Sequence, residues 1–270
     1  NDFWKCFDEF VKVNGKLNDW TQATYEKFAA LRNHLQDFNK KLNFEDFNED
    51  GIADFINYMG KKGMKNSTIN KQLGFLRWYL RWCYEKDYHT NHTFEHFKPK
   101  LKSASKRVIF LTQEELEKVE NLKIPEKYTS LEAVRDVFLF CCYTGLRYSD
   151  VNNLTWEDIH NRKIEIVTVK TADRIIIEIN SKSQAILDKY SDIHFPDKKV
   201  LPIISNQKMN KRLHTLCKLA GIDEPIKSTH YEGNKRIDEV KPKYELVGTH
   251  CGRRTFICTA LAKGIPPSVV

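Results

Sequence analysis

The sequence lacks several features that would define common classes of protein. No apolar run approaches the roughly 18 residues that a membrane span needs, and the start at residues 1–4 has neither the basic nor the apolar part of a signal peptide. An initiator Met is also absent, so we expect that a longer chain was trimmed. Gly-x-x-x-x-Gly-Lys-Ser/Thr and Gly-x-Gly-x-x-Gly do not occur, and nucleotide hydrolysis and dinucleotide binding therefore have no support.

Regularly spaced cysteines are missing too. The seven cysteines show no regular spacing, and Cys141 and Cys142 are adjacent in an apolar run. This pattern predicts buried, reduced thiols and a cytoplasmic protein. His89, His92 and His96 have a ligand-like spacing, but no Cys or acid completes a set, so we expect no bound metal.

Positive charge is abundant and unevenly placed. The net charge is +8, and residues 1–97 hold 14 basic and 14 acidic residues, so residues 98–270 carry the whole excess. Within the neutral part, the stretch between Asp54 and Glu85 contains six Lys or Arg and no acid. Such segments suit a polyanion, because each cation near a phosphate releases condensed counterions. A solvated basic face is the structural alternative, and charge alone leaves the two evenly matched.

Hydrophobic periodicity predicts a helical domain over residues 1–97. One helix, capped by Thr21, carries Phe28, Leu31, Leu35 and Phe38. A second helix, with Gly60 as its stop, carries Ile52, Phe55, Ile56 and Met59. Ser67 is predicted to cap a third, whose core stripe is Ile69, Leu73, Leu76, Leu80 and Cys83.

A second stripe on the third helix combines hydrogen-bond donors with Gly74, and Trp78 flanks it. Glycine permits close approach of a backbone or phosphate, at a cost of about 1 kcal/mol relative to Ala in a helix. We expect this face to lie in a DNA groove. The predicted DNA contacts in and around it are Lys65, Ser67, Thr68, Asn70, Lys71, Arg77 and Arg81. A solvent-exposed face with a chance glycine is the alternative.

Residues 98–108 form a predicted basic linker, with five cations and no acid between Lys98 and Arg107. Its predicted DNA contacts are Lys102, Lys106 and Arg107. A capping box at Thr112 and Glu115 opens the second domain, residues 109–270. In this domain we expect an apolar helix over 131–143 that Gly145 ends, followed by a short helix capped by Ser149. A hairpin is predicted over 162–179, with Lys170 at its turn. A helix over 205–220, a second hairpin within 229–247 and a last helix from near Cys251 are predicted to follow.

Four polar side chains of this second domain suit phosphodiester chemistry. Arg147 lies on a tight turn after Gly145, and His250 and Arg253 are i and i+3 neighbours on one helix face. Two guanidinium groups can neutralise the charge that a pentacoordinate phosphate develops. Lys170 or His250 can give a proton to the departing sugar oxygen. Taken singly, each is more often structural: Arg147 would pair with Asp150 on the surface, His250 would be half-buried, and Lys170 a solvated turn residue.

These motifs in this order resemble the tyrosine site-specific recombinases, the phage integrase family. Thr144-Gly145-Leu146-Arg147, an acid three residues later, a hairpin lysine and His250-x-x-Arg253-x-Thr255-Phe256 match the family's pattern. The resemblance implies a mainly α fold with small β-hairpins, made of a helical SAM-like core-binding domain and an α+β catalytic domain. It further implies double-stranded DNA as the partner, a bacterial mobile element as the source, and no cofactor.

The resemblance also assigns roles. Arg147 and Arg253 would clamp the scissile phosphate, Lys170 would protonate the leaving 5′ oxygen, His250 would assist, and Asp150 would orient Arg147. The family's nucleophilic Tyr follows the His-x-x-Arg motif, but no Tyr, His or Trp follows Arg253 here. We therefore expect a catalytic domain cut before its nucleophile, inactive in strand cleavage and monomeric, whereas the full-length enzyme would form a tetramer on DNA. A non-catalytic DNA-binding relative and a type IB topoisomerase are the alternatives.

Overall fold

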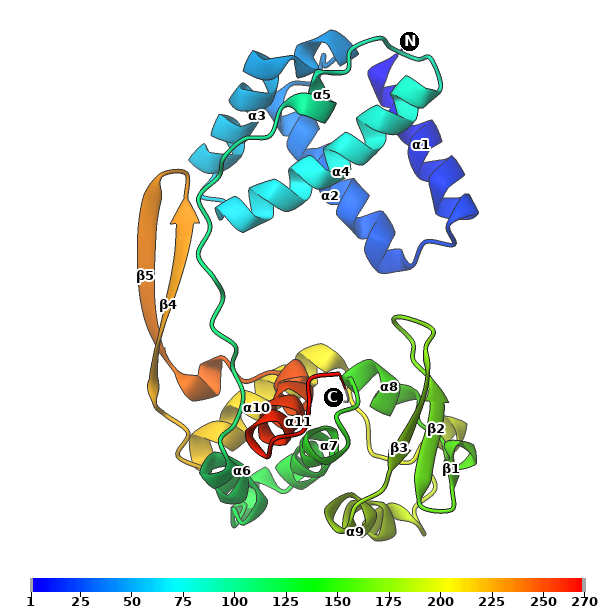
Figure 1. The fold of residues 1–270 in the computed structure, drawn as a ribbon, viewed down its shortest axis with the longest axis vertical. Helices are drawn as coiled ribbons and strands as arrows, with labels where there is room; N and C mark the ends of the chain where they lie inside the picture. The colour runs from blue at the N-terminus through cyan, green and yellow to red at the C-terminus, as the bar shows by residue number, and fades with distance from the viewer. Residues whose placement is uncertain (1, 269–270) are drawn as a thin grey trace. The chain divides into compact units, whose positions relative to one another are not determined.

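A computed structural model describes residues 2–268, which fall into two compact units (Figure 1). The first unit contains the residues up to Lys106 together with Ser228–Glu239. The second contains Arg107–Lys227 together with the residues from Val240 on. Both are mainly helical with small antiparallel sheets, which confirms the predicted fold class. None of the helices within residues 2–268 is long and apolar enough to cross a membrane.

The first unit is a helical bundle built around aromatic side chains. Its helices are α1 (Phe3–Leu17), α2 (Gln22–Phe38), α3 (Glu49–Lys61), α4 (Asn66–Glu85) and the short α5 (Thr93–His96). Tyr79 of α4 lies at the centre, with its ring against Phe7 and Phe10 and its hydroxyl donating to the Phe3 carbonyl. The predicted apolar stripes of α2, α3 and α4 face this core. Helix α1 lies outside the three helices predicted for this domain.

Two predicted helix ends in the first unit are wrong by one or two residues. Gly60 lies inside α3, which continues to Lys61, and the left-handed residue that follows is Gly63. Ser67 lies within the first turn of α4, whose N-cap is Lys65. Thr21 does occupy the N-cap of α2, but its hydroxyl contacts Thr24 and accepts no backbone N–H.

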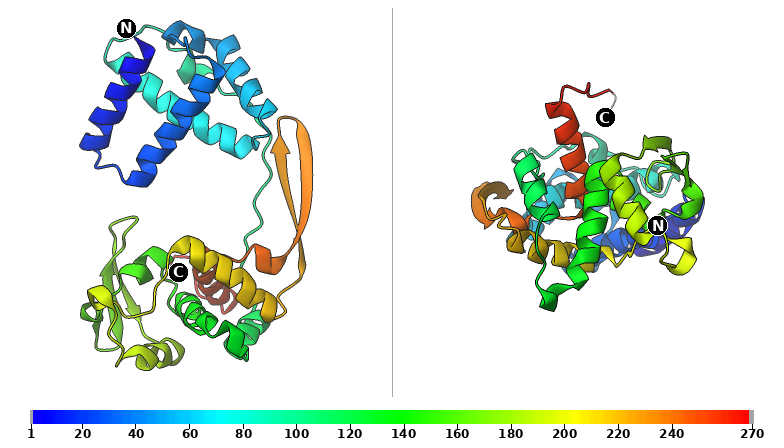
Figure 2. Two further views of the ribbon diagram at one scale, coloured as in Figure 1. Left: turned by 180° about the vertical axis from the view of Figure 1, so that it is seen from behind. Right: turned by 90° about the horizontal axis from the view of Figure 1, so that it is seen from below.

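The second unit surrounds the long buried helix α7. Its helices are α6 (Gln113–Glu120), α7 (Ser130–Thr144), α8 (Tyr148–Asn153), α9 (Ser181–Tyr190), α10 (Asn206–Leu219) and α11 (Thr249–Ala262), and its three-stranded antiparallel sheet contains β1 (Ile159–His160), β2 (Lys163–Val167) and β3 (Arg174–Glu178). Helices α7 and α11 lie side by side (Figure 2). They approach closely at Gly252, where an added Cβ would come within 2.7 Å of the Cys141 Cβ.

Most predicted elements of the second unit are present, with shifted ends. The Thr112–Glu115 capping box forms, and Gly145 ends α7 in the left-handed conformation. Ser149 is wrong as a cap, because Arg147 is the N-cap of α8. Helix α11 begins at Thr249, two residues before Cys251, near which its start was predicted. Cys141 and Cys142 are buried free thiols, as predicted.

The second predicted hairpin comprises β4 (Pro225–Glu232) and β5 (Lys235–Pro242). At its base the Lys243 amide donates to the Glu224 carbonyl at 2.9 Å. At its tip, within the first unit, Gly233 exchanges two 2.8 Å hydrogen bonds with the side-chain amide of Asn66. Asn66 is 1% exposed and also donates to the Lys102 carbonyl, so its amide closes three backbone contacts.

Candidate active site

Arg147 and Lys170 line one cavity of about 520 Å³ in the second unit, together with His250. Three separate elements supply them. Arg147 is the N-cap of α8, Lys170 lies in the loop between β2 and β3, and His250 is the second residue of α11. The other lining residues are Tyr148, Ser149, Asn152, Ile204, Ser205, Asn206 and Thr249.

Arg253 connects α11 to the turn that carries Arg147. Its Nη1 donates to the Gly145 carbonyl at 2.6 Å, so one of its nitrogens helps to fix this turn. Gly145 has a φ of +70°, and a Cβ there would meet the Phe256 ring at 2.6 Å. The glycine is therefore required both by its conformation and by its contact with α11. Arg147 and Arg253 approach the same buried turn from two helices.

Asp150 is the acid that accompanies these cations. Its side chain is almost wholly buried; one oxygen accepts the Val169 amide at 3.0 Å, and the other lies 3.9 Å from Arg147 Nη1. The second oxygen has no hydrogen-bond partner among residues 2–268. Asp150 thus faces Arg147 and in addition holds the backbone of the Lys170 loop.

The Lys170 loop is ordered by its own hydrogen bonds. Thr168 donates its amide to the Asp173 carbonyl and accepts the Ala172 amide, at 2.9 and 3.0 Å. Because Asp150 fixes the Val169 amide directly before it, Lys170 projects from a constrained turn. Lys170 itself is exposed, so its ammonium group is free to reach an oxygen of a bound ligand.

The start of α11 is held by α10. The N-cap Gly248 has no side chain, and Asn210 replaces it by accepting the Thr249 amide at 2.8 Å. Asn206 accepts the Thr249 hydroxyl at 2.9 Å. A helix N-terminus needs such acceptors because its first amides have no partner within the helix. Two asparagines of α10 therefore set the position of the residue next to His250.

The cavity carries a large excess of positive charge. Burial, together with Arg254, Arg253, Lys170 and Arg147, lowers the pKa of His250 below its ordinary 6.5. Burial and the neighbouring Arg147 likewise lower the pKa of Arg253, although a guanidinium stays protonated. One carboxylate, Asp150, opposes these cations. An anion in the cavity would relieve the repulsion, so the site is built to accept one.

Tyr148 is the tyrosine that lines this cavity, and its geometry is unsuited to nucleophilic attack. Its hydroxyl donates to the Ile204 carbonyl, and burial raises its pKa above 10. A half-buried, protonated phenol that is hydrogen-bonded to a backbone carbonyl is a poor nucleophile.

Comparison with family profiles gave two matches. The phage integrase SAM-like domain matches residues 2–101, and the phage integrase family matches residues 109–232. The chain belongs to the phage integrase family of tyrosine recombinases. Enzymes of this family cleave and rejoin DNA. The matched segments include Arg147, Asp150 and Lys170, whereas His250 and Arg253 lie beyond them and rest on the geometry above.

Solved integrase structures share this fold. A Tn1549 transposon integrase in complex with a circular intermediate DNA is 16% identical, with a TM-score of 0.77 over 98% of this chain and 88% of that one. A lambda integrase dimer bound to a core site is also 16% identical, with a TM-score of 0.74 over 97% and 87% of the two chains. A lambda integrase tetramer on a Holliday junction gives 0.72 over 98% and 74%. Comparison with curated protein sequences gave no match.

In this integrase the predicted DNA contacts of the first unit fall into two groups, which are exposed residues and residues that have partners within the unit. Lys65, Ser67, Thr68, Asn70 and Lys71 are exposed on α4 or directly before it. Arg77 is half-buried and donates to the Phe97 carbonyl at 2.7 Å, and Arg81 pairs with Glu95 at 3.4 Å. Both arginines therefore already have partners within the unit.

The two remaining features of the α4 face also differ from each other. An added Cβ at Gly74 would meet no atom within 4 Å, so the fold itself does not require a glycine there. Trp78 is partly exposed, yet its ring packs edge-on against Phe10, Trp20 and Phe28. It therefore belongs to the edge of the aromatic core.

The structure also shows the surroundings of the linker cations and of His89. Lys102 and Lys106 are exposed, and Arg107 lies 3.6 Å from Glu224. His89 stacks on Phe44, and its Nε2 lies 3.0 Å from the Leu80 carbonyl. Residues 2–268 contain no group of three or more metal-ligating side chains close enough to hold an ion.

Helix α10 carries cations that our sequence analysis did not assign. Lys208, Lys211, Arg212 and Lys218 lie on it, and none pairs with an acid within residues 2–268. The helix begins at the cavity, because Ser205 and Asn206 line it. The signal was available in the sequence, since no acid occurs between Asp197 and Asp223. This is the pattern that singled out residues 55–84.

We expect the affinity of the site for DNA to depend on pH through His250. The charge of a bound phosphate would offset the cations around His250 and raise its pKa, so DNA binding should take up protons. Affinity should rise as the pH falls from the pKa of the bound state to that of the free state. Calorimetry in buffers of different ionisation enthalpy, near pH 6.5, measures the uptake. The variant His250→Gln should abolish it, and equal uptake by the variant would contradict the assignment.

Proposed function

We propose that this chain binds duplex DNA and holds a phosphodiester in the cavity of the second unit, as part of site-specific strand exchange through a 3′-phosphotyrosyl link. The supporting observation is that Arg147, Lys170 and His250 line one cavity, while Arg253 binds the turn directly before Arg147 and Asp150 faces Arg147 as an opposing acid. Neighbouring cations with so little compensation are costly unless an anion neutralises them.

The chemistry follows from the side chains present. Arg147 and the uncommitted nitrogens of Arg253 would bind the two non-bridging oxygens, where negative charge grows in the transition state. Lys170, exposed on a fixed loop, would deliver a proton to the departing 5′ oxygen. His250, with its lowered pKa, is neutral near pH 7 and can either donate to the phosphate or accept the proton of a nucleophile.

The nucleophile is assigned to no residue of this sequence. No tyrosine follows Arg253, and the hydroxyl of Tyr148 is bound to a carbonyl. The 270-residue chain is therefore proposed to hold a DNA phosphate without becoming covalently attached to it, and to act as a monomer. Strand exchange by a tetramer, the state in which lambda integrase occupies a Holliday junction, is proposed for the complete enzyme. DNA contacts by α4 and by Lys102, Lys106 and Arg107 are part of the same proposal.

Helix α10 supplies the sharpest test of DNA binding. We expect the affinity for a duplex to fall by about 10³-fold or more between 50 and 200 mM salt, since six or more phosphate contacts would be lost to competing ions. Lys208→Gln and Lys211→Gln should each lower the slope of log affinity against log salt by about one. Titration of a labelled duplex at four salt concentrations gives these slopes.

A matched control is Lys198→Gln, which removes a cation already paired with Glu157. Its salt slope should equal that of the unchanged chain. Affinity that does not vary with salt would contradict DNA binding as a whole. If the salt slopes of Lys208→Gln and Lys211→Gln also equal that of the unchanged chain, only the DNA contacts of α10 are contradicted.

A further inference from the structure

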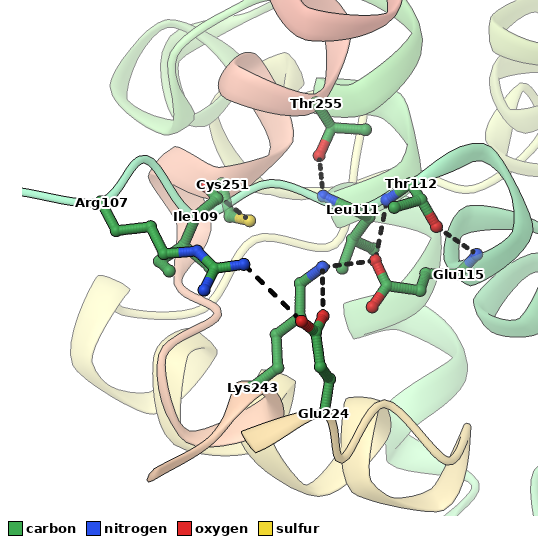
Figure 3. A network of polar contacts seen from close by, with 9 residues as sticks. All are labelled: Arg107, Ile109, Leu111, Thr112, Glu115, Glu224, Lys243, Cys251 and Thr255. Atoms are coloured by element: carbon green, nitrogen blue, oxygen red, sulfur yellow. Dashed lines mark hydrogen bonds and ion pairs between the residues drawn. The ribbon is translucent and has the colours of Figure 1, made fainter. Parts of the chain in front are cut away.

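The segment that leads out of the basic linker is hydrogen-bonded to the back of α11 (Figure 3). The Leu111 amide donates to the Thr255 hydroxyl at 2.9 Å, and the Cys251 thiol donates to the Ile109 carbonyl at 3.3 Å. Leu111 and Thr255 are each 1% exposed. A backbone amide buried this deeply depends on its partner, because no water can replace it.

Lys243 fixes the same segment from another direction. Its ammonium lies 2.6 Å from a Glu115 oxygen and 5.9 Å from the centre of the Phe110 ring. That Glu115 oxygen also accepts the Thr112 amide, and a Glu224 oxygen lies 4.0 Å from the ammonium. The side chains of Lys243 and Glu115 are both largely buried, so this pair is shielded from solvent and holds the segment in one place.

The contacts of this segment and the phosphate site occupy different faces of one helix. Cys251 and Thr255 are i and i+4 neighbours on α11, and His250 and Arg254 are another such pair about 100° away. Gly252, about 100° beyond Cys251 around the helix, approaches Cys141 closely and so packs α11 against α7. A displacement of the Ile109–Leu111 backbone therefore bears directly on the helix that carries His250 and Arg253.

We propose that Thr255 is a positioning residue for the phosphate site, which it serves by fastening the end of the linker to α11. The proposal rests on the function proposed above. The linker segment before Arg107 is basic and exposed, so contact with DNA would order or pull it, and the Leu111–Thr255 bond would transmit this to α11. Coupling of this kind is reciprocal: occupancy of the phosphate site should in turn protect the Leu111 amide.

The test compares Thr255→Val, which keeps the shape of the side chain but removes its acceptor, with Thr255→Ser, which retains the acceptor. Two readouts are taken on the 270-residue chain, with and without a DNA duplex: hydrogen exchange of the Leu111 amide, and the titration of His250 by NMR. In the unchanged chain and in Thr255→Ser, DNA should slow exchange by about tenfold or more and raise the pKa of His250. In Thr255→Val, exchange should become fast and insensitive to DNA, and the His250 shift should shrink.

Tyr190→Phe is the matched control. It removes a buried hydroxyl whose 2.7 Å bond to Asp136 joins α9 to α7 and involves no residue of α11 or of the linker, and it should leave both DNA-dependent readouts unchanged. Both Thr255→Val and Tyr190→Phe can lower the stability of the second unit. If Thr255→Val does so and still shows the full DNA-dependent shift in the pKa of His250, Thr255 is merely structural and the proposal is overturned. Should Thr255→Val fail to fold, Thr255→Cys, with a weaker acceptor, should give an intermediate shift, and a full shift there overturns the proposal equally.

The two proposals fail differently. If DNA produces no His250 shift in the unchanged chain, the phosphate site itself is contradicted. If the shift is present there and undiminished in Thr255→Val, only the role of Thr255 is contradicted.

Discussion

Replacing Gly145 by alanine should destabilise the second unit by about 2–4 kcal/mol, one of the largest effects of any single methyl group in this chain. Two costs add. Gly145 has a φ of +70°, which an L side chain adopts only with strain, and the new Cβ would lie 2.6 Å from the Phe256 ring. Phe256 cannot move freely, because it belongs to α11. Urea unfolding followed by circular dichroism measures the loss.

The substitution should also weaken DNA binding. The Gly145 carbonyl accepts Arg253 Nη1, and Arg147 follows two residues later, so a displaced turn misplaces both guanidinium groups. An affinity for duplex DNA that stays unchanged in a folded Gly145→Ala variant would argue against a shared role of the two arginines.

The same substitution at Gly74 is the natural control, and its effect on stability should have the opposite sign. Gly74 lies in an exposed part of α4 where a Cβ would meet nothing. Alanine should therefore stabilise the first unit by about 0.5–1 kcal/mol. Weaker DNA binding by this more stable variant would support close approach of DNA at α4, and unchanged binding would contradict it.

Local patterns predicted the helices with the clearest periodicity. The stripes Phe28–Leu31–Leu35 and Ile69–Leu73–Leu76 are buried, and the Thr112–Glu115 box forms, because each depends on residues within a turn or two of one another. The exact caps were less predictable. Ser67 and Ser149 were chosen for their side chains, yet the extended residues at these helix starts are Lys65 and Arg147. Packing of the neighbouring segments, rather than a capping hydroxyl, sets where α4 and α8 begin.

The order of motifs predicted the residues of the candidate site, but the contacts that support them come from distant parts of the chain. Nothing near Asp150 in sequence indicates that it accepts the Val169 amide, and nothing near Thr249 indicates Asn206 and Asn210. The same holds for Asn66 and the tip of the β4–β5 hairpin, which are 167 residues apart. Side-chain-to-backbone bonds of this kind leave no periodic signal, so a single sequence cannot reveal them.

Substitution of Asp150 should also have a large effect, because its carboxylate contacts the β2–β3 loop and lies close to the arginines. Asp150→Ala should cost about 3 kcal/mol, since it removes the acceptor of the part-buried Val169 amide bond and the charge that opposes Arg147 and Arg253. Asp150→Asn keeps an acceptor for the amide and loses only the charge, so its cost should be about 1 kcal/mol. Chemical denaturation of the two variants gives the difference.

Hydrogen exchange at Val169 separates the two contributions. In Asp150→Ala the amide should exchange at least tenfold faster than in Asp150→Asn, because the alanine variant releases the loop that presents Lys170. The asparagine variant should also show a lower pKa for His250, since a negative charge near the surrounding cations is gone. Because a neutral His250 would then persist to lower pH, the proton uptake that accompanies DNA binding should shift to lower pH by the same amount. Equal exchange rates in the two variants would mean that Asp150 acts on the arginines alone.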